Sequence, residues 1–260
     1  MVRPKKFLGQ HFLKDKNIAH RIVESLTLAK GTNHVVEIGP GTGVLTTLLL
    51  NIEAIDLKVV EIDRESVAHL TEHFPALKGR IISGDFLELD LEKEFPDRLN
   101  IIGNFPYNIS SQIFFKVLDN YERVQQVVCM VQKEVAERIA EKEGSKTYGI
   151  LSVLLQTYYD IEFLFKVPPG VFFPPPKVMS AVIRLVRNNR YKLECDPQLY
   201  RKVVKQSFQT RRKTLRNALK ILNLPPAVLK LDLMDKRAEQ LSVEQFIFLT
   251  KEIERSNEVR

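Results

Sequence analysis

The sequence predicts an α/β fold, in which a Rossmann-like, mainly parallel sheet carries helices on both faces and is followed by a small all-helical domain. Three observations predict it. Short apolar segments with strand character alternate with helical patterns from residue 34 onward, which is typical of a parallel sheet covered by helices. The first of these segments runs directly into a glycine-rich loop. Residues 197–255 show helical patterns and no convincing strand.

The individual elements follow from the spacing of apolar residues. Asp15 is a candidate helix N-cap, because Ile18 and Ile22 recur after it at helical spacing. The expected strands are 34–38, 57–62, 80–83, 99–103, 124–131, 161–167 and 178–186. The expected helices between them are 44–50, 64–73, 110–118, 134–141 and 150–158. In such sheets ligands bind beyond the carboxyl ends of the strands, so the residues that follow each strand are the candidates for function.

The composition changes after Arg187, where the strand patterns stop. We therefore expect a boundary near residues 186–196, with a first domain over residues 1–190 and a helical second domain over residues 191–260.

Composition and charge limit the class of protein. Hydrophobic residues make up 44% of the chain, which is enough for a real core, and the formal net charge of +7 favours a polyanionic partner. Cys129 and Cys195 lie far apart and outside any metal-ligand spacing, so we expect neither a disulfide framework nor a bound metal. Because no apolar run is long enough for a membrane span or a secretory signal, we expect a cytoplasmic protein without a membrane partner. We also expect a monomer, although no sequence pattern indicates the oligomeric state.

The glycine-rich loop reads Glu37-x-Gly39-x-Gly41-x-Gly43 and follows the first strand directly. Glycines in such a loop allow a tight turn and a close approach of backbone to ligand. A dinucleotide-binding loop would need its third glycine at position 44, which is Val44. The run instead resembles the cofactor loop of class I methyltransferases, with Gly39 and Gly41 as candidate cofactor-binding residues. A structural turn without a ligand is the alternative.

Acidic residues end the next two strands. Glu61 stands at the end of the second strand, where a carboxylate can accept hydrogen bonds from both hydroxyls of a ribose. Asp85 and Phe86 follow the third strand, where they can bind an adenine amine and pack on its ring. Together these groups fit a ligand with an adenosine half and no pyrophosphate.

The fourth strand leads into Asn104-Phe105-Pro106-Tyr107, which matches the N-x-P-Y form of the motif of amino-group methyltransferases. The adenine amine is a poor nucleophile because its lone pair is delocalised into the ring. The Asn104 side-chain oxygen and the Phe105 carbonyl can accept from both of its N–H groups, and Pro106 stiffens their loop. Tyr107 can stack on the base, which contributes about 1–3 kcal/mol. An ordinary Asn-x-Pro turn is the alternative.

Together these motifs resemble the KsgA-type family of ribosomal RNA adenine dimethyltransferases over nearly the whole chain. The segment from Phe7 to Leu13 resembles the opening motif of that family, with His11 where the family usually has Asn. Further matches are residues 132–135, 148–153 and 171–178. The resemblance implies that His11 and Leu13 edge the pocket of the cofactor, S-adenosylmethionine. It also implies that Phe172 packs on the target adenine opposite Tyr107.

The family implies a specific reaction and partner. Two methyl groups are added to the N6 amine of each of two adjacent adenosines near the 3′ end of 16S ribosomal RNA in the small subunit. The basic stretch over residues 207–220 is then an RNA-binding helix, with Arg211, Arg212, Lys213 and Arg216 as the contacts. A solvated charged face is the alternative for this stretch.

Two alternatives to this function remain open from the sequence. One is an enzyme that methylates an adenine of the large ribosomal subunit. The other is a mainly non-catalytic factor that binds immature ribosomes.

Overall fold

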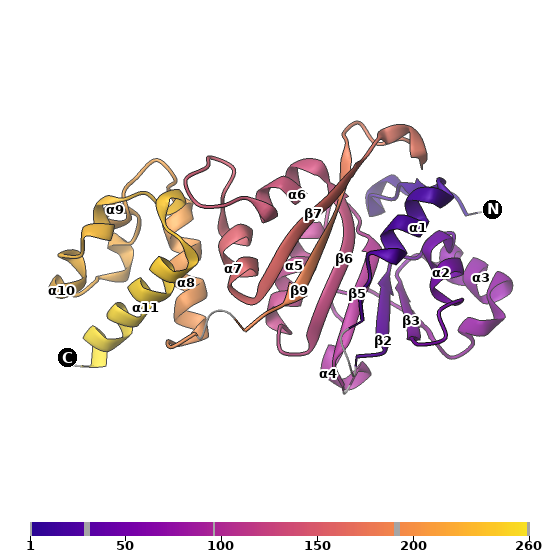
Figure 1. Ribbon diagram of the computed structural model, residues 1–260, viewed down its shortest axis with the longest axis horizontal. Coiled ribbons are helices and arrows are strands. Elements are labelled where there is room, and N and C mark those ends of the chain that lie inside the picture. Colours follow the sequence, from indigo (N-terminus) through magenta and orange to yellow (C-terminus); the bar gives the residue numbers. More distant parts are fainter. Residues whose placement is uncertain (1, 29–31, 96, 190–192, 259–260) are drawn as a thin grey trace. The chain divides into compact units, whose positions relative to one another are not determined.

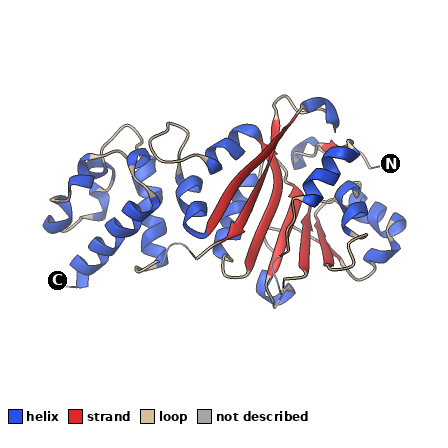
Figure 2. Cartoon of the chain, viewed as in Figure 1, coloured by secondary structure: helices blue, strands red, loops and turns tan. Residues whose placement is uncertain are grey.

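The computed structural model describes residues 2–28, 32–95, 97–189 and 193–258. The chain forms two compact units, shown in Figure 1: the first comprises Met1–Ala136 and Asp160–Arg187, and the second Glu137–Tyr159 and Asn188–Arg260. The strands lie in the first unit, whereas the second is built from helices (Figure 2). Among the residues that the structure describes, no helix is long and apolar enough to cross a membrane.

The first unit is organised around a seven-stranded sheet with the strand order β4-β3-β2-β5-β6-β9-β7. Strands β2 to β6 run parallel to one another, and β9 is antiparallel to β6. The strands of this sheet are β2 (His34–Ile38), β3 (Asp56–Glu61), β4 (Ile81–Ser83), β5 (Leu99–Asn104), β6 (Val124–Gln132), β7 (Tyr159–Val167) and β9 (Ser180–Arg187). This arrangement confirms the expected α/β class with a mainly parallel sheet.

The chain order reverses between β2 and β5. From β2 the chain proceeds outward through β3 to β4, and it then crosses back to place β5 on the other side of β2. A ligand crevice forms at such a switch point, because the connections after the two central strands lead away in opposite directions. The glycine-rich loop follows β2 and the Asn104 motif follows β5, so both lie at this crevice.

A second, two-stranded sheet joins the N-terminal segment to the proline-rich loop. It pairs β1 (Phe12–Leu13) with β8 (Phe172–Phe173) in antiparallel register, Phe12 opposite Phe173 and Leu13 opposite Phe172. In Figure 1 the salmon hairpin that carries β8 accordingly lies beside the indigo N-terminal segment. Sequence patterns did not indicate this pairing, because two residues are too few to show alternation.

Three helices of the first unit begin at aspartate caps that the sequence encodes. The Asp15 side chain accepts from the backbone N–H groups of Asn17 and Ile18, as expected for the helix N-cap. Asp63 and Asp90 cap the helices that follow them in the same way. The helices that lie wholly in this unit are α1 (Lys16–Glu24), α2 (Val44–Leu49), α3 (Arg64–His73), α4 (Leu91–Glu94) and α5 (Ser110–Asp119).

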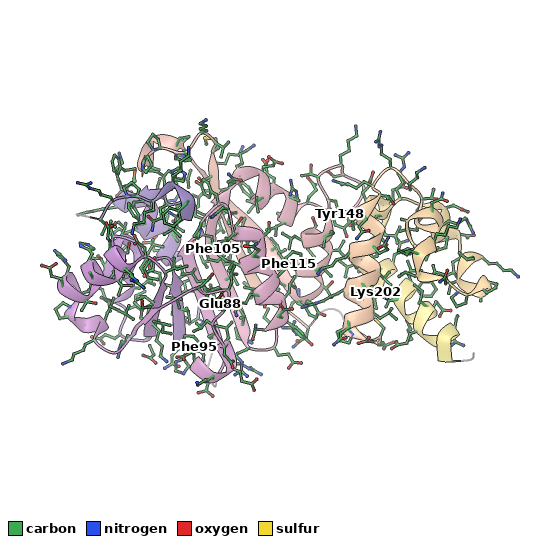
Figure 3. The ribbon with its side chains drawn as sticks, turned by 180° about the vertical axis from the view of Figure 1, so that it is seen from behind. Glu88, Phe95, Phe105, Phe115, Tyr148 and Lys202 are labelled. Carbon is green, nitrogen blue, oxygen red and sulfur yellow. The ribbon has the colours of Figure 1, made fainter. Side chains whose placement is uncertain are left out.

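The second unit has its own core. Tyr200 is fully buried and its hydroxyl hydrogen-bonds to the Thr157 hydroxyl at 2.9 Å, while Phe208 packs against Tyr148 and Phe246. Figure 3 labels Tyr148 among the side chains of this unit. Its longer helices are α7 (Ile150–Tyr158), α8 (Pro197–Gln209) and α11 (Val243–Glu258), with the short helices α9 (Leu215–Ala218) and α10 (Pro226–Leu229), while α6 (Lys133–Ala140) spans the division between the units.

The structure therefore groups residues 137–159 with the C-terminal helices, whereas the sequence patterns placed them in the first domain. The reason is the apolar helix α7, whose Thr157 contacts Tyr200. The expected boundary between residues 190 and 191 lies outside the described residues.

The Gly103→Ala substitution tests the close approach of β5 and β2. A Cβ atom on Gly103 would lie 2.5 Å from the carbonyl oxygen of Ile38, so the two central strands would have to separate. We expect a loss of about 1–3 kcal/mol in the free energy of unfolding, measured by urea denaturation. Gly170→Ala is the matched control, because a Cβ atom there meets nothing within 4 Å. Equal effects of the two substitutions would contradict the steric argument.

Candidate active site

A cavity of about 210 Å³ opens at the carboxyl ends of the parallel strands. Most of the residues expected to form the site line it: His11, Gly39, Gly41, Glu61, Asp85, Phe86, Asn104, Phe105, Pro106 and Tyr107. Its wall is completed by residues 8–12 of the N-terminal segment. The fold thus brings together groups that are nearly 100 residues apart in the sequence.

Glu61 is tied to the glycine-rich loop. Its Oε2 accepts from the backbone N–H of Gly41 at 3.1 Å, and its Oε1 accepts from the backbone N–H of Asp63 at 2.9 Å. Burial raises the pKa of the Glu61 carboxyl. Each carboxylate oxygen can accept a second hydrogen bond, so this group is held in place and still able to bind two hydroxyls.

Gly39 has no side chain to occupy the cavity that it lines. Its φ of +64° lies in the left-handed region, and a Cβ atom there would meet nothing within 4 Å. Since Gly39 lines the cavity, any side chain at this position would project into space that a ligand can use.

Asp85 and Phe86 form the wall after β4. The Asp85 Oδ1 accepts from the backbone N–H of Leu87 at 2.8 Å, which fixes the carboxylate in a turn. Phe86 is buried. No hydrogen bond to Oδ2 of Asp85 is present among the described residues, so this oxygen can accept from a ligand amine.

Asn104 is oriented by the N-terminal segment. Its Nδ2 donates to the main-chain carbonyl of His11 at 2.8 Å. Because only the nitrogen end of an amide can donate to a carbonyl, this bond fixes which end is oxygen. Nδ2 is therefore occupied by protein, while Oδ1 has no hydrogen-bond partner in the part of the chain that the structure describes.

The neighbour of Asn104 anchors the loop. The backbone N–H of Phe105 donates to the carbonyl of Met130 at 3.0 Å, and its side chain is buried against Phe114. Figure 3 shows Phe105 in the body of the first unit. With its ring and its N–H both held, Phe105 presents only its backbone to the cavity.

Tyr107 is held from two sides. Its hydroxyl forms a short hydrogen bond with the hydroxyl of Ser180, and its ring stacks on His11 with a centroid separation of 5.3 Å. His11 in turn forms a 2.7 Å hydrogen bond from Nδ1 to the carbonyl of Pro174. Since a carbonyl can only accept, Nδ1 carries the proton. The His11 side chain thus links the acceptor loop to the proline-rich loop.

A polar cluster fastens the N-terminal segment beside the cavity. Lys5 forms an ion pair with Asp63 and lies 3.3 Å from Glu65, and Gln10 donates to Asp63 at 3.3 Å. Although burial alone would raise the pKa of Asp63, the hydrogen bonds from Lys5 and Gln10 hold it below its usual value. Sequence patterns did not single out this cluster, because its members come from separate segments.

Glu37 lies beneath the glycine-rich loop and is almost fully buried. Its Oε2 accepts from the hydroxyl of Thr46 at 2.6 Å. Burial raises the pKa of this carboxyl to about 8. The sequence motif contains Glu37, but the sequence alone gave it no role.

The structure buries Phe172. Its side chain is 1% exposed and belongs to the hydrophobic core, and it is not among the residues that line the cavity. Its packing on the target adenine stays a prediction. The reason is strand alternation: in β8 Phe172 points into the core and its neighbour Phe173 is 55% exposed. Leu13 is also a core residue and lines only a small hollow beside the glycine-rich loop.

The family assignment is decided by comparison over the whole chain. Residues 1–255 match the family described as "Ribosomal RNA adenine dimethylase". The chain belongs to this family. Members of the family include "Ribosomal RNA small subunit methyltransferase A" from Cytophaga hutchinsonii, which is 59% identical over 96% of both chains. The protein of the same name from Parabacteroides distasonis is 58% identical over 96% of this chain and 94% of its own length.

Solved structures show the same fold. A dimethyladenosine transferase from Plasmodium falciparum superimposes with a TM-score of 0.81 at 25% identity, covering 95% of this chain and 98% of its own. The 23S rRNA methyltransferase ErmE superimposes with a TM-score of 0.66 at 24% identity, covering 93% of this chain and 99% of its own.

The basic stretch of the second unit is not one helix. Helix α8 ends at Gln209 and α9 begins at Leu215, because Thr210 leaves the helical conformation. Arg211 donates to the carbonyl of Tyr148 at 2.6 Å. Arg216 donates to Asp235 at 2.9 and 3.0 Å. Both are thus engaged within the protein.

The two remaining cations of the expected set lie in the turn between α8 and α9. Arg212 and Lys213 are exposed, with no ion pair among the described residues. They are the members of the expected set that face solvent without a protein partner. As for metals, no group of potential metal ligands occurs in the described part of the chain.

Glu37→Gln should alter how stability depends on pH. The folded-state pKa of about 8 exceeds the ordinary value of 4.5, so the native state retains a proton that the unfolded state loses, and wild-type stability falls as the pH rises through this window. Glutamine can still accept from Thr46 but does not titrate. Relative to wild type, the variant should gain on the order of a few kcal/mol between about pH 5 and about pH 9, measured by urea denaturation. A difference that is the same at both pH values would contradict the titration of Glu37.

Proposed function

We propose that this chain transfers methyl groups from S-adenosylmethionine to the N6 amines of two adjacent adenosines near the 3′ end of 16S ribosomal RNA. The product is N6,N6-dimethyladenosine, and the reaction belongs to the maturation of the small ribosomal subunit in the cytoplasm. One observation carries the proposal: the free Oδ1 of Asn104 lies in the same cavity as the glycine-rich loop and the carboxylates of Glu61 and Asp85.

The cavity suits an adenosine with an uncharged-to-cationic tail. Glu61 would accept from the ribose hydroxyls, and Asp85 would accept from the adenine amine beside Phe86. The open space over Gly39 would take the methionine part. The buried carboxylate of Glu61 would be costly next to a phosphate, whereas a positive sulfonium offsets that cost.

The acceptor side of the site would hold the target amine. S-adenosylmethionine supplies an activated methyl group, so the protein needs no strong base. The Oδ1 of Asn104 and the carbonyl of Phe105 would accept from the amine and draw its lone pair away from the ring. Because both groups are fixed by bonds to His11 and Met130, little reorganisation is needed during the reaction. Tyr107 would stack on the base.

The relatives named as small-subunit methyltransferases support 16S ribosomal RNA as the substrate. The net charge of +7 suits this partner, because cations that neutralise phosphates supply most of the affinity for RNA. In the second unit, the exposed Arg212 and Lys213 are the side chains that we propose to contact phosphates.

A direct assay tests the substrate. The purified protein is incubated with unmethylated small subunits or with large subunits and a labelled methyl donor, and the digested RNA is analysed by mass. We expect N6,N6-dimethyladenosine in the small-subunit RNA alone. Label in the large subunit, or on another base, would overturn the proposal.

Asn104→Ala should abolish most of the transfer. Removing one acceptor of the target amine should lower kcat about 10²- to 10³-fold in the small-subunit assay. The control is Asn120→Ala, in which an asparagine bonded to the carbonyl of Lys116 is lost at the end of α5. An Asn104→Ala variant that still supports ribosome maturation in cells would separate catalysis from an assembly role. A variant with unchanged kcat would refute the acceptor role.

Glu61→Gln should weaken cofactor binding. The amide has one acceptor oxygen, so one of the two N–H groups of Gly41 and Asp63 would face another donor. We expect the Kd for S-adenosylmethionine, measured by calorimetry, to rise about ten-fold or more. Glu88→Gln, at an exposed position after the Asp85 turn, should leave the Kd unchanged. Equal Kd values for the two variants would argue against binding of the ribose by Glu61.

A further inference from the structure

Two large aromatic side chains lie uncovered beside the cavity. Phe7 is 77% exposed and Phe173 is 55% exposed, although phenylalanine is ordinarily among the most buried residues. Both belong to the first unit. Neither contributes to the core, so stability of the fold does not account for their type.

Both residues are fastened to the acceptor side of the cavity. The carbonyl of Phe7 accepts from Nδ2 of Asn108, which directly follows Tyr107, at 3.3 Å. Phe173 pairs with Phe12 across the two-stranded sheet, and the next carbonyl, that of Pro174, bonds to His11. Because Asn108, Phe12 and His11 all line the cavity, these bonds place the backbone of Phe7 and of Phe173 beside it.

The two segments that carry these rings contain cations and no acids. Residues 1–14 and residues 163–187 include no aspartate or glutamate. Lys6 directly precedes Phe7, and Lys177 comes four residues after Phe173. Both lysines are exposed, with no ion pair among the described residues. A surface of this charge attracts a polyanion and would repel a basic protein segment.

We propose that Phe7 and Phe173, with Lys6 and Lys177, form a platform for the single-stranded RNA on either side of the adenine in the cavity. These four residues are called the mouth platform. Aromatic rings that alternate with cations are the usual means of holding unpaired bases, because every base has a stacking face. The inference rests on the proposed function and names the part of the site that holds the flanking nucleotides. In a substrate with two adjacent adenosines, one base stacks on the platform while its neighbour reacts.

Steady-state kinetics with unmethylated small subunits test the platform. Phe7→Ala and Phe173→Ala should each raise KM for the subunit about ten-fold, with the Kd for S-adenosylmethionine unchanged. Phe248→Ala is the matched control, because Phe248 is 45% exposed but lies on α11 in the second unit. Normal KM values for both platform variants would overturn the proposal.

A second pair of variants distinguishes stacking from packing. Phe173→Trp should retain the wild-type KM, whereas Phe173→Leu should behave like Phe173→Ala. Rescue by leucine would show apolar packing alone and would overturn the stacking role. The chain has no tryptophan, so Phe173→Trp also gives a single tryptophan, whose fluorescence can be excited selectively.

The fluorescence of this tryptophan separates the platform from the chemistry. An unpaired RNA of about ten nucleotides with two adjacent adenosines should quench it, and the same RNA should not quench Phe248→Trp. If the RNA quenches Phe173→Trp but the wild-type protein transfers no methyl group, the proposed function is refuted and the mouth platform is supported. If transfer is normal and saturating RNA quenches neither variant, the platform fails.

Discussion

The hydrogen bond from Nδ2 of Asn104 to the carbonyl of His11 is the contact on which the site depends. It fixes the amide at the end of β5, and it holds the N-terminal segment across the cavity. Without it, the asparagine could present either end to a ligand, and the segment would lose its bond to β5. One neutral hydrogen bond contributes only about 1 kcal/mol to stability. The main effect of this bond is therefore to orient the side-chain amide of Asn104.

The sheet itself supplies the other fixed parts. Strands β2 and β5 approach so closely that the carbonyl of Ile38 leaves no room for a side chain at Gly103. This contact sets the distance between the glycine-rich loop and the Asn104 motif. The carboxylate of Glu61 then draws the loop toward β3 through the N–H of Gly41. Contacts of backbone atoms thus set the spacing of the loops that form the cavity.

The sequence predicted the central strands and the groups at their ends because each is encoded locally. The strand over residues 34–38 and the loop at Gly39 are contiguous, and so are the strand over residues 99–103 and Asn104. The burial of Phe172 could not be predicted, because it follows from the pairing of β8 with β1, about 160 residues apart. The sequence patterns also did not predict the interruption of the basic stretch, where α8 ends at Gln209 and α9 begins at Leu215.

The pairing of β1 with β8 also sets an order of events during synthesis. The N-terminal wall of the cavity emerges from the ribosome first, yet its partner strand follows only after most of the first unit. Contacts that are distant in sequence form late, because the intervening chain must first be available. A nascent chain that already contains the glycine-rich loop and the asparagine motif therefore still lacks the partner strand of β1. The pairing that holds the N-terminal wall can form only when Phe172 and Phe173 have left the exit tunnel.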